Sequence, residues 1–151
     1  MGPPAGTADR PLWRCPRCER TFAARRQTHT CAALRTLDDL FAGCDVQVRA
    51  TFDRVLGVVQ ALGPVEVLPQ KTRIALHLRM SFAALMPGQR WLDGHVVLDR
   101  RLESQRFRRI EVYSRRNVLH AFRLQSPQEV DAEVAAWLEA AYRVGQQLHR
   151  T

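Results

Sequence analysis

The spacing of apolar residues changes once along the chain, at Gly63-Pro64, and this change constrains the fold more than any other feature. Before it, from Asp45 onward, apolar residues recur every three or four positions, as in a helix that buries one face: Val48, Phe52, Val55, Val59 and Leu62. After it, the period drops to two, which is typical of strands, in the segments 65–67, 74–80, 82–85, 91–98, 107–113 and 118–124. This pattern predicts an α+β fold, with an antiparallel sheet of about five strands and helices packed on one face.

Capping residues mark both ends of this domain. Ser126-Pro127-Gln128-Glu129 combines an N-cap, a proline at the first helical position and a glutamate at the capping-box position. It predicts the start of a terminal helix that buries Val130, Val134, Trp137, Leu138, Ala141, Val144 and Leu148. At the other end, residues 36–41 are expected to form a short helix that Gly43 ends. The Arg-rich connection before Phe107 has room for another short helix.

The composition is that of a folded, soluble protein. Of 151 residues, 46% are hydrophobic and 25% are charged, close to the average for soluble domains. No apolar run approaches the roughly 20 residues of a membrane-spanning helix, and Met1 to Leu12 lacks the apolar centre of a signal peptide. We therefore expect a disordered tail over 1–12, a zinc finger over 13–33 and an α+β domain over 36–151. We also expect a cytoplasmic location and no membrane partner.

Positive charge is concentrated in two blocks. The net charge is +8, and Lys71 is the one basic residue that is not arginine. Seven arginines stand against two acids in residues 1–35, and eight stand against two in residues 100–123. Such blocks suit the phosphates of nucleic acid. A GC-rich genome, which favours arginine codons, explains them equally well, and blocks of charge are often merely solvated.

The strongest chemical signal is a set of metal ligands spaced Cys-x2-Cys-x10-His-x-Cys. The ligands are Cys15, Cys18, His29 and Cys31, and Pro16 stiffens the turn between the first two. Thiolates and imidazole at such spacing are the ligands of structural Zn²⁺. Because four side chains close the tetrahedron, no coordination position is open for catalysis. Unliganded thiols and a redox Cys-x-x-Cys are the alternatives, but the redox motif would need a strand–helix unit around it.

The segment between the ligand pairs is too short for a base-reading helix. His29 and Cys31 are two residues apart and cannot share one helix face, so the chain bends there. Trp13 and Phe22 are expected to form the small core of this unit. Its arginines, Arg25 and Arg26 among them, either contact phosphates or keep the unit soluble. Cys44 lies in an unrelated segment and is expected to be a small buried hydrophobe rather than a ligand.

Alternation within the predicted strands places cations, imidazoles and aromatic rings on one sheet face. In residues 71–79 the odd positions are mostly polar and the even ones mostly apolar, so one face is cationic and the other is core. Later strands add further members if the register brings them together, and the full set is Lys71, Arg73, His77, Arg79, Trp91, His95, Arg109, Tyr113 and His120. Such a face suits an anionic or base-bearing ligand. The alternative is that the solvated side of any one-sided sheet is polar.

Signals for catalysis and for a second metal are weak. His77, His95 and His120 could bind a metal only if the fold gathers them, and a lone histidine is more often an ordinary surface or hydrogen-bonded residue. Asp93 and Glu111 are carboxylates, but neither stands at a recognisable spacing from a catalytic partner residue. No nucleophile elbow, phosphate loop or dinucleotide-binding glycine pattern occurs. An enzyme is therefore the least favoured class.

Several short segments together give the chain a resemblance to a bacterial family of uncharacterised proteins, common in actinobacteria, in which a short zinc finger precedes a domain of unknown function. They are Trp13 to Cys18 with His29-Thr30-Cys31, Leu37 to Gly43, Ala61 to Val65, Lys71 to Ala75, Trp91 to His95 and Ser126-Pro127. The resemblance implies a two-part organisation and zinc at the four ligands named above, without Cys44. It implies no established activity. Relatives of the main domain accompany restriction-type nucleases, which favours nucleic acid.

Two functions from different classes follow. In the first, the protein binds DNA or RNA, with Arg25, Arg26 and Arg108 contacting phosphates and the sheet face contacting bases or sugars. In the second, the sheet face is a pocket for an anionic small molecule, with Lys71, Arg73 and Arg109 as the clamp and Trp91 and Tyr113 as walls. A concave pocket on this face favours the second function, and a flat open sheet favours the first.

Overall fold

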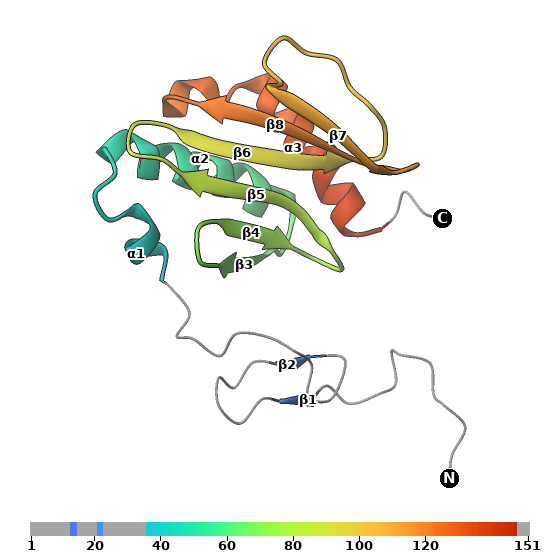
Figure 1. Cartoon of the computed structure of the whole chain (residues 1–151), viewed down its shortest axis with the longest axis horizontal. Coiled ribbons are helices and arrows are strands. Elements are labelled where there is room, and N and C mark those ends of the chain that lie inside the picture. Colours follow the sequence, from blue (N-terminus) through green and yellow to red (C-terminus); the bar gives the residue numbers. More distant parts are fainter. Residues whose placement is uncertain (1–12, 15–20, 23–35, 148–151) are drawn as a thin grey trace. The chain divides into compact units, whose positions relative to one another are not determined.

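The structure, a computed structural model, describes residues 13–14, 21–22 and 36–147 (Figure 1). Contacts divide the chain into two units, Met1–Leu34 and Arg35–Thr151. In the first unit, the strands β1 (Trp13–Arg14) and β2 (Thr21–Phe22) pair antiparallel, with Trp13 opposite Phe22. The predicted tail, the predicted zinc ligands and two predicted phosphate contacts lie outside the described residues: 1–12, Cys15, Cys18, His29, Cys31, Arg25 and Arg26.

The second unit contains one antiparallel sheet of six strands, in the order β3-β4-β5-β6-β8-β7. The strands are β3 (Glu66–Pro69), β4 (Ile74–His77), β5 (Ser81–Pro87), β6 (Leu92–Leu98), β7 (Arg109–Ser114) and β8 (Asn117–Leu124). All six segments with a period of two form strands of this sheet, one more than the approximate number expected, and the short β3 pairs with β4. The connection 99–108, which contains no helix, leads to the sheet edge. The Arg115-Arg116 turn then brings β8 back beside β6.

The two long helices lie on the same face of this sheet (Figure 1). α2 (Val46–Leu62) begins after Asp45 and ends at Gly63, as the apolar spacing predicts. The short helix α1 (Leu37–Phe41) precedes it and has a capping box. In this box, Thr36 Oγ1 accepts a hydrogen bond from the Asp39 N–H at 3.1 Å, and Asp39 Oδ2 accepts one from the Thr36 N–H at 3.0 Å.

The terminal helix begins later than its predicted cap. Pro127–Glu129 form a single 3-10 turn, η2, and α3 (Ala132–Gly145) begins after Asp131. Asp131 Oδ1 accepts from the Val134 N–H at 3.1 Å, which makes Asp131 the N-cap. The carboxylate of Glu129 accepts from the Gln125 N–H instead of closing a capping box. The side chain of Val130 is buried in the core, and this turns the chain inward before the helix can start.

The hydrophobic core lies between the helices and the sheet and consists of side chains between Leu40 and Tyr142. Phe52 and Trp137 are fully or almost fully buried, as the helical spacing predicts. Cys44 is half-buried and packs against this core. Gly94 lies where strands and core approach closely, because a Cβ there would stand 2.9 Å from Leu85 and 3.0 Å from Phe122. Within the described residues, no helix combines the length and apolar character needed to cross a membrane.

The register assigns each strand residue to the helix-covered face or to the open face. Ile74, Leu85, Gly94 and Phe122 are neighbours across four strands and face the core. Because side chains alternate along a strand, the adjacent row faces away from the helices. This row on the open face consists of Ala75, Ala84, His95, Ala121 and Arg109.

Candidate functional site

The open face of the sheet contains a hollow of about 310 Å³, here called the sheet cavity. Its lining residues are Arg73, Ala75, Met80, Ser81, Ala83, Ala84, His95, Val97, Tyr113, Asn117 and Leu119. The floor of the cavity is low because the residues paired with His95 on both neighbouring strands are alanines. Ala84 lies opposite His95 on one side and Ala121 on the other. The volume is at the lower end of the roughly 300–1,000 Å³ typical of small-molecule pockets.

His95 lies in the middle of this cavity and is uncharged at neutral pH. Burial lowers its pKa to about 4, and the positive charges of Arg73 and Arg109 act in the same direction, against the charge of Glu111. A neutral imidazole has one N–H donor and one acceptor nitrogen. His95 therefore offers both kinds of hydrogen bond to a molecule in the cavity.

The cationic residues around His95 differ in how far their charge is neutralised. Arg109 Nε lies 3.0 Å from Glu111 Oε1 and forms an ion pair. Arg73 donates from Nε to Gln70 Oε1 at 2.7 Å and has no acidic partner among the described residues. Tyr113 is 63% exposed, and its pKa is raised by burial of the hydroxyl, by its hydrogen bond to Glu111 and by the charge of that carboxylate. Arg73 is thus the cation of the cavity that is not paired with a carboxylate.

Trp91 lies on the open face but outside the sheet cavity. The Arg123 guanidinium stacks on its ring, with Cζ 4.1 Å from the ring centroid. Arg123 also holds Asp93 through two bonds, Nε to Oδ1 at 2.6 Å and a terminal nitrogen to Oδ2 at 3.2 Å. The hydrogen bond to Asp93 raises the pKa of Arg123. The sequence grouped Trp91 with His95 on one face, but it did not indicate that Arg123 and Asp93 join Trp91.

His120 faces the core, so its predicted place in the cationic cluster is wrong. It pairs with Val96 and Ile110 on the helix-covered face and is fully buried. Its Nε2 accepts from the Leu102 N–H at 2.9 Å, and its Nδ1 donates to the Val118 carbonyl at 2.9 Å. Two backbone groups thus satisfy an imidazole that the sequence suggested was exposed. Because His95 lies on the opposite face, the three histidines cannot share a metal ion. Within the described part of the chain, no group of three metal-ligating side chains occurs.

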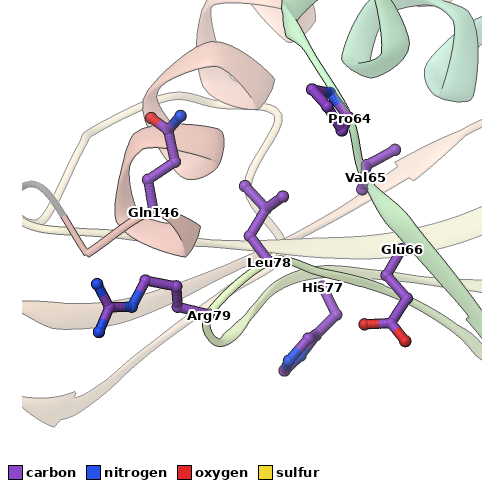
Figure 2. Close-up of a pocket in the computed structure, with 7 residues that line it drawn as sticks. All are labelled: Pro64, Val65, Glu66, His77, Leu78, Arg79 and Gln146. Carbon is purple, nitrogen blue, oxygen red and sulfur yellow. The ribbon is translucent and has the colours of Figure 1, made fainter. Parts of the chain in front are cut away.

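Three further predicted residues lie away from the sheet cavity. Lys71 is in the loop between β3 and β4 and does not line it. His77 and Arg79 line a second hollow, here called the β3–β4 pocket (Figure 2). The register shifts between Leu76 and His77, and the chain turns there toward the end of α3. His77 stays on the open face, opposite Glu66 of β3, but it lies beyond the sheet cavity, whereas Arg79 follows the end of β4 in the turn toward α3.

The sequence reasoning missed the residues that make the sheet cavity hollow. Ala75 and Ala84 carry no chemistry of their own, but their small side chains create the space around His95. Val97 and Leu119 add an apolar floor, and both are buried although they face away from the helices. The available signal was the alternation itself, in which alanines occupy the positions that a solvated sheet face normally fills with polar side chains.

The second basic block is largely neutralised by nearby carboxylates. The distances between the paired nitrogen and oxygen atoms range from 2.6 to 3.3 Å in the pairs Arg100–Asp99, Arg101–Glu103, Arg106–Asp131, Arg109–Glu111 and Arg123–Asp93. Arg108 is exposed and has no ion pair within the described part of the chain. The block should therefore attract phosphates less strongly than its number of arginines suggests.

Comparison with known proteins places the second unit in a family. No curated protein and no solved structure matches the chain significantly. One family model, described as a domain of unknown function (DUF5655), matches residues 37–145, which include α1, the whole sheet and α3. Because this match covers most of the chain, the protein belongs to the DUF5655 family.

Proposed function

We propose that the domain binds a small anionic molecule in the sheet cavity. The observation that carries this proposal is an arginine without an acidic partner among the described residues, Arg73, at the edge of a hollow that holds the half-buried, neutral His95. A guanidinium binds a carboxylate or phosphate through two parallel N–H bonds. Since Arg73 uses Nε for Gln70, its terminal nitrogens are the donors directed to the anion.

The remaining lining residues suit the uncharged part of such a molecule. Val97 and Leu119 provide an apolar floor, and Tyr113 provides an aromatic wall. The neutral imidazole of His95 accepts or donates one further hydrogen bond without adding charge. We therefore favour an anion with a flat apolar body over a bare inorganic ion.

An Arg73→Gln variant tests the proposal. We expect phenyl phosphate and benzoate to shift the amide NMR signals of Ala84, His95 and Leu119 in the full-length protein, and the uncharged benzamide not to do so. One charge-assisted hydrogen bond contributes about 1.5–3 kcal/mol, so Arg73→Gln should weaken binding roughly ten- to hundredfold. Arg100→Gln is the matched control, because this arginine is exposed and pairs with Asp99. Equal affinities in the two variants would refute the site.

Binding of single-stranded nucleic acid is the second candidate, and the exposed Trp91 and Tyr113 on one sheet face support it. Trp91 is 36% exposed and Arg123 stacks on it, so a base could stack beside this pair. We expect Trp91→Ala to weaken binding to single-stranded DNA or RNA in fluorescence anisotropy. The double variant Arg108→Gln/Arg109→Gln should reduce the salt dependence. Binding that neither variant changes would place nucleic acid elsewhere.

A structural zinc ion at Cys15, Cys18, His29 and Cys31 is part of the proposal, together with a cytoplasmic location, where thiols stay reduced. Among the described residues, the buried core of the second unit begins at Leu40, and Leu37 packs against it. Chelation or Cys15→Ser should therefore remove one zinc per chain while cooperative unfolding of residues 36–147 persists. Elemental analysis and thermal unfolding measure the two effects. Cys44→Ser is the control and should retain the zinc. Loss of all cooperative unfolding on chelation would show that the units are not independent.

A further inference from the structure

We infer that the β3–β4 pocket is a second binding site, separate from the sheet cavity, for a zwitterionic molecule with an apolar side chain, such as an amino acid or a short peptide with free ends. The pocket has a volume of about 590 Å³ and is lined by Pro64, Val65, Glu66, His77, Leu78, Arg79 and Gln146. These residues come from the start of β3 and the two positions before it, the end of β4 with the turn that follows, and the C-cap of α3 (Figure 2).

Hydrogen bonds tie the three walls of this pocket together. Tyr142 of α3 donates from its hydroxyl to the Pro64 carbonyl at 2.8 Å. The carbonyl of Gly145, at the end of the same helix, accepts from the N–H groups of Arg79 at 3.0 Å and Met80 at 3.4 Å. Glycine is needed at position 145, because a Cβ there would lie 2.4 Å from the Phe82 ring. The pocket is therefore preformed, which lowers the entropic cost of binding.

Opposite charges stand on two sides of the pocket without neutralising each other. Figure 2 shows the carboxylate of Glu66 and the guanidinium of Arg79 on either side of His77. Neither Glu66 nor Arg79 forms an ion pair among the residues that the structure describes. The imidazole of His77 donates or accepts at Nδ1 with Ser81 Oγ at 3.0 Å, and its Nε2 has no partner within the same residues. A bound molecule can thus reach three polar groups.

Apolar side chains form another part of the lining, on the side toward the helices. Val65 and Leu78 are half-buried and pack against the hydrophobic core, and Pro64 continues this surface. In Figure 2 the Leu78 side chain points to the opposite side of the strand from His77. An apolar side chain placed here would remove its own surface and that of Leu78 from water.

Charge complementarity selects the class of ligand. A simple anion would meet the carboxylate of Glu66, and a simple cation would meet the guanidinium of Arg79, so each is disfavoured by one wall. A molecule with one ammonium and one carboxylate satisfies both groups. Free amino acids and short peptides share this chemistry and differ in the distance between their charges. A series of increasing length therefore distinguishes these two sources.

Isothermal titration of the full-length protein with leucine, Leu-Leu and Leu-Leu-Leu tests this inference, with N-acetyl-Leu-Leu and Leu-Leu-amide as blocked probes. We expect one member of the free series to bind at least tenfold more tightly than either blocked dipeptide. Glu66→Gln should remove the discrimination against the acetylated probe, and Arg79→Gln should remove that against the amide. Arg90→Gln, an exposed cation outside the pocket, should change neither.

Three results would overturn the inference. They are no binding by any free member of the series, equal binding of free and blocked probes, and loss of binding on Arg73→Gln with none on Glu66→Gln or Arg79→Gln. The last result would place the ligand in the sheet cavity instead. Thermal unfolding of each variant confirms that a lost signal is not due to misfolding, and both substitutions lie at exposed positions that should leave the fold intact.

Discussion

Replacing Trp137 by alanine is expected to lower the free energy of unfolding by about 3–5 kcal/mol. Trp137 is 2% exposed and packs against aromatic side chains from two other elements. Its ring centroid lies 4.4 Å from that of Phe107 and 5.5 Å from that of Phe122. Truncation removes these contacts and leaves a cavity between α3 and the sheet that its surroundings fill only in part.

The same substitution should loosen the connection between β6 and β7. Arg106 in this connection stacks on Trp137, with Cζ 5.3 Å from the ring centroid. It also donates to both oxygens of Asp131 at 3.0 Å and to Glu133 Oε1 at 3.1 Å. Without the indole, this guanidinium loses its apolar support, so amides in 99–108 should exchange with solvent faster than in the wild-type protein.

Urea unfolding measures the first effect, and Trp91→Ala is its matched control. The substitution is chemically identical, but Trp91 is 36% exposed and stacks on Arg123 at the surface. We expect Trp91→Ala to cost less than about 1 kcal/mol. Similar losses in the two variants would contradict the described core. Hydrogen exchange at neutral pH measures the effect on the connection.

Lowering the pH from 7 to 5 is expected to destabilise the domain through its histidines. The pKa of His95 is about 4 in the folded protein, against about 6.5 in an unfolded chain. Between these values the unfolded state binds a proton that the folded state does not, so stability falls as the pH falls. His95 alone should lower the free energy of unfolding by about 2 kcal/mol between pH 7 and pH 5. Below pH 4 the folded state is also protonated, and this contribution stops changing.

His120 acts in the same direction. Burial lowers its pKa, the hydrogen bond to Val118 opposes this, and the charge of Arg101 lowers it further. Protonation would also make Nε2 a donor and break its bond to the Leu102 N–H. The loss of stability on acidification therefore has two sources, one on each face of the sheet.

Urea unfolding at pH 7 and pH 5 separates these sources. In His95→Gln, only the part of the stability loss that His120 contributes should remain. The fall in the free energy of unfolding between pH 7 and pH 5 should therefore be smaller than in the wild-type protein by about 2 kcal/mol. His77→Gln leaves His95 in place and should keep the full dependence. The pKa of Asp131 is lowered by its capping bond to Val134 and its bond to Arg106. The range from pH 7 to pH 5 therefore stays above the pH at which such carboxylates become protonated. An unchanged pH dependence in His95→Gln would contradict a half-buried, neutral His95.

Much of the candidate site could be predicted from alternation alone. Arg73 and His95 were placed on one face, and both line the sheet cavity. Tyr113 also lines it, and Arg109 lies in the row beside it. The prediction was wrong for His120 and misplaced Arg79, because a buried imidazole with two backbone partners and the end of β4 at His77 leave no trace in the local pattern.

The amino-acid sequence by itself determined the kind and approximate limits of each element in the second unit, and which side of each long helix is buried. These properties depend on residues close together in the chain, whose spacing decides whether apolar side chains share one face. The tertiary structure alone decided the strand order, the partners of the arginines in 100–123, and the hollow over Ala75 and Ala84. Each of these depends on register between residues far apart in the chain, and a shift by one residue would move every side chain to the other face.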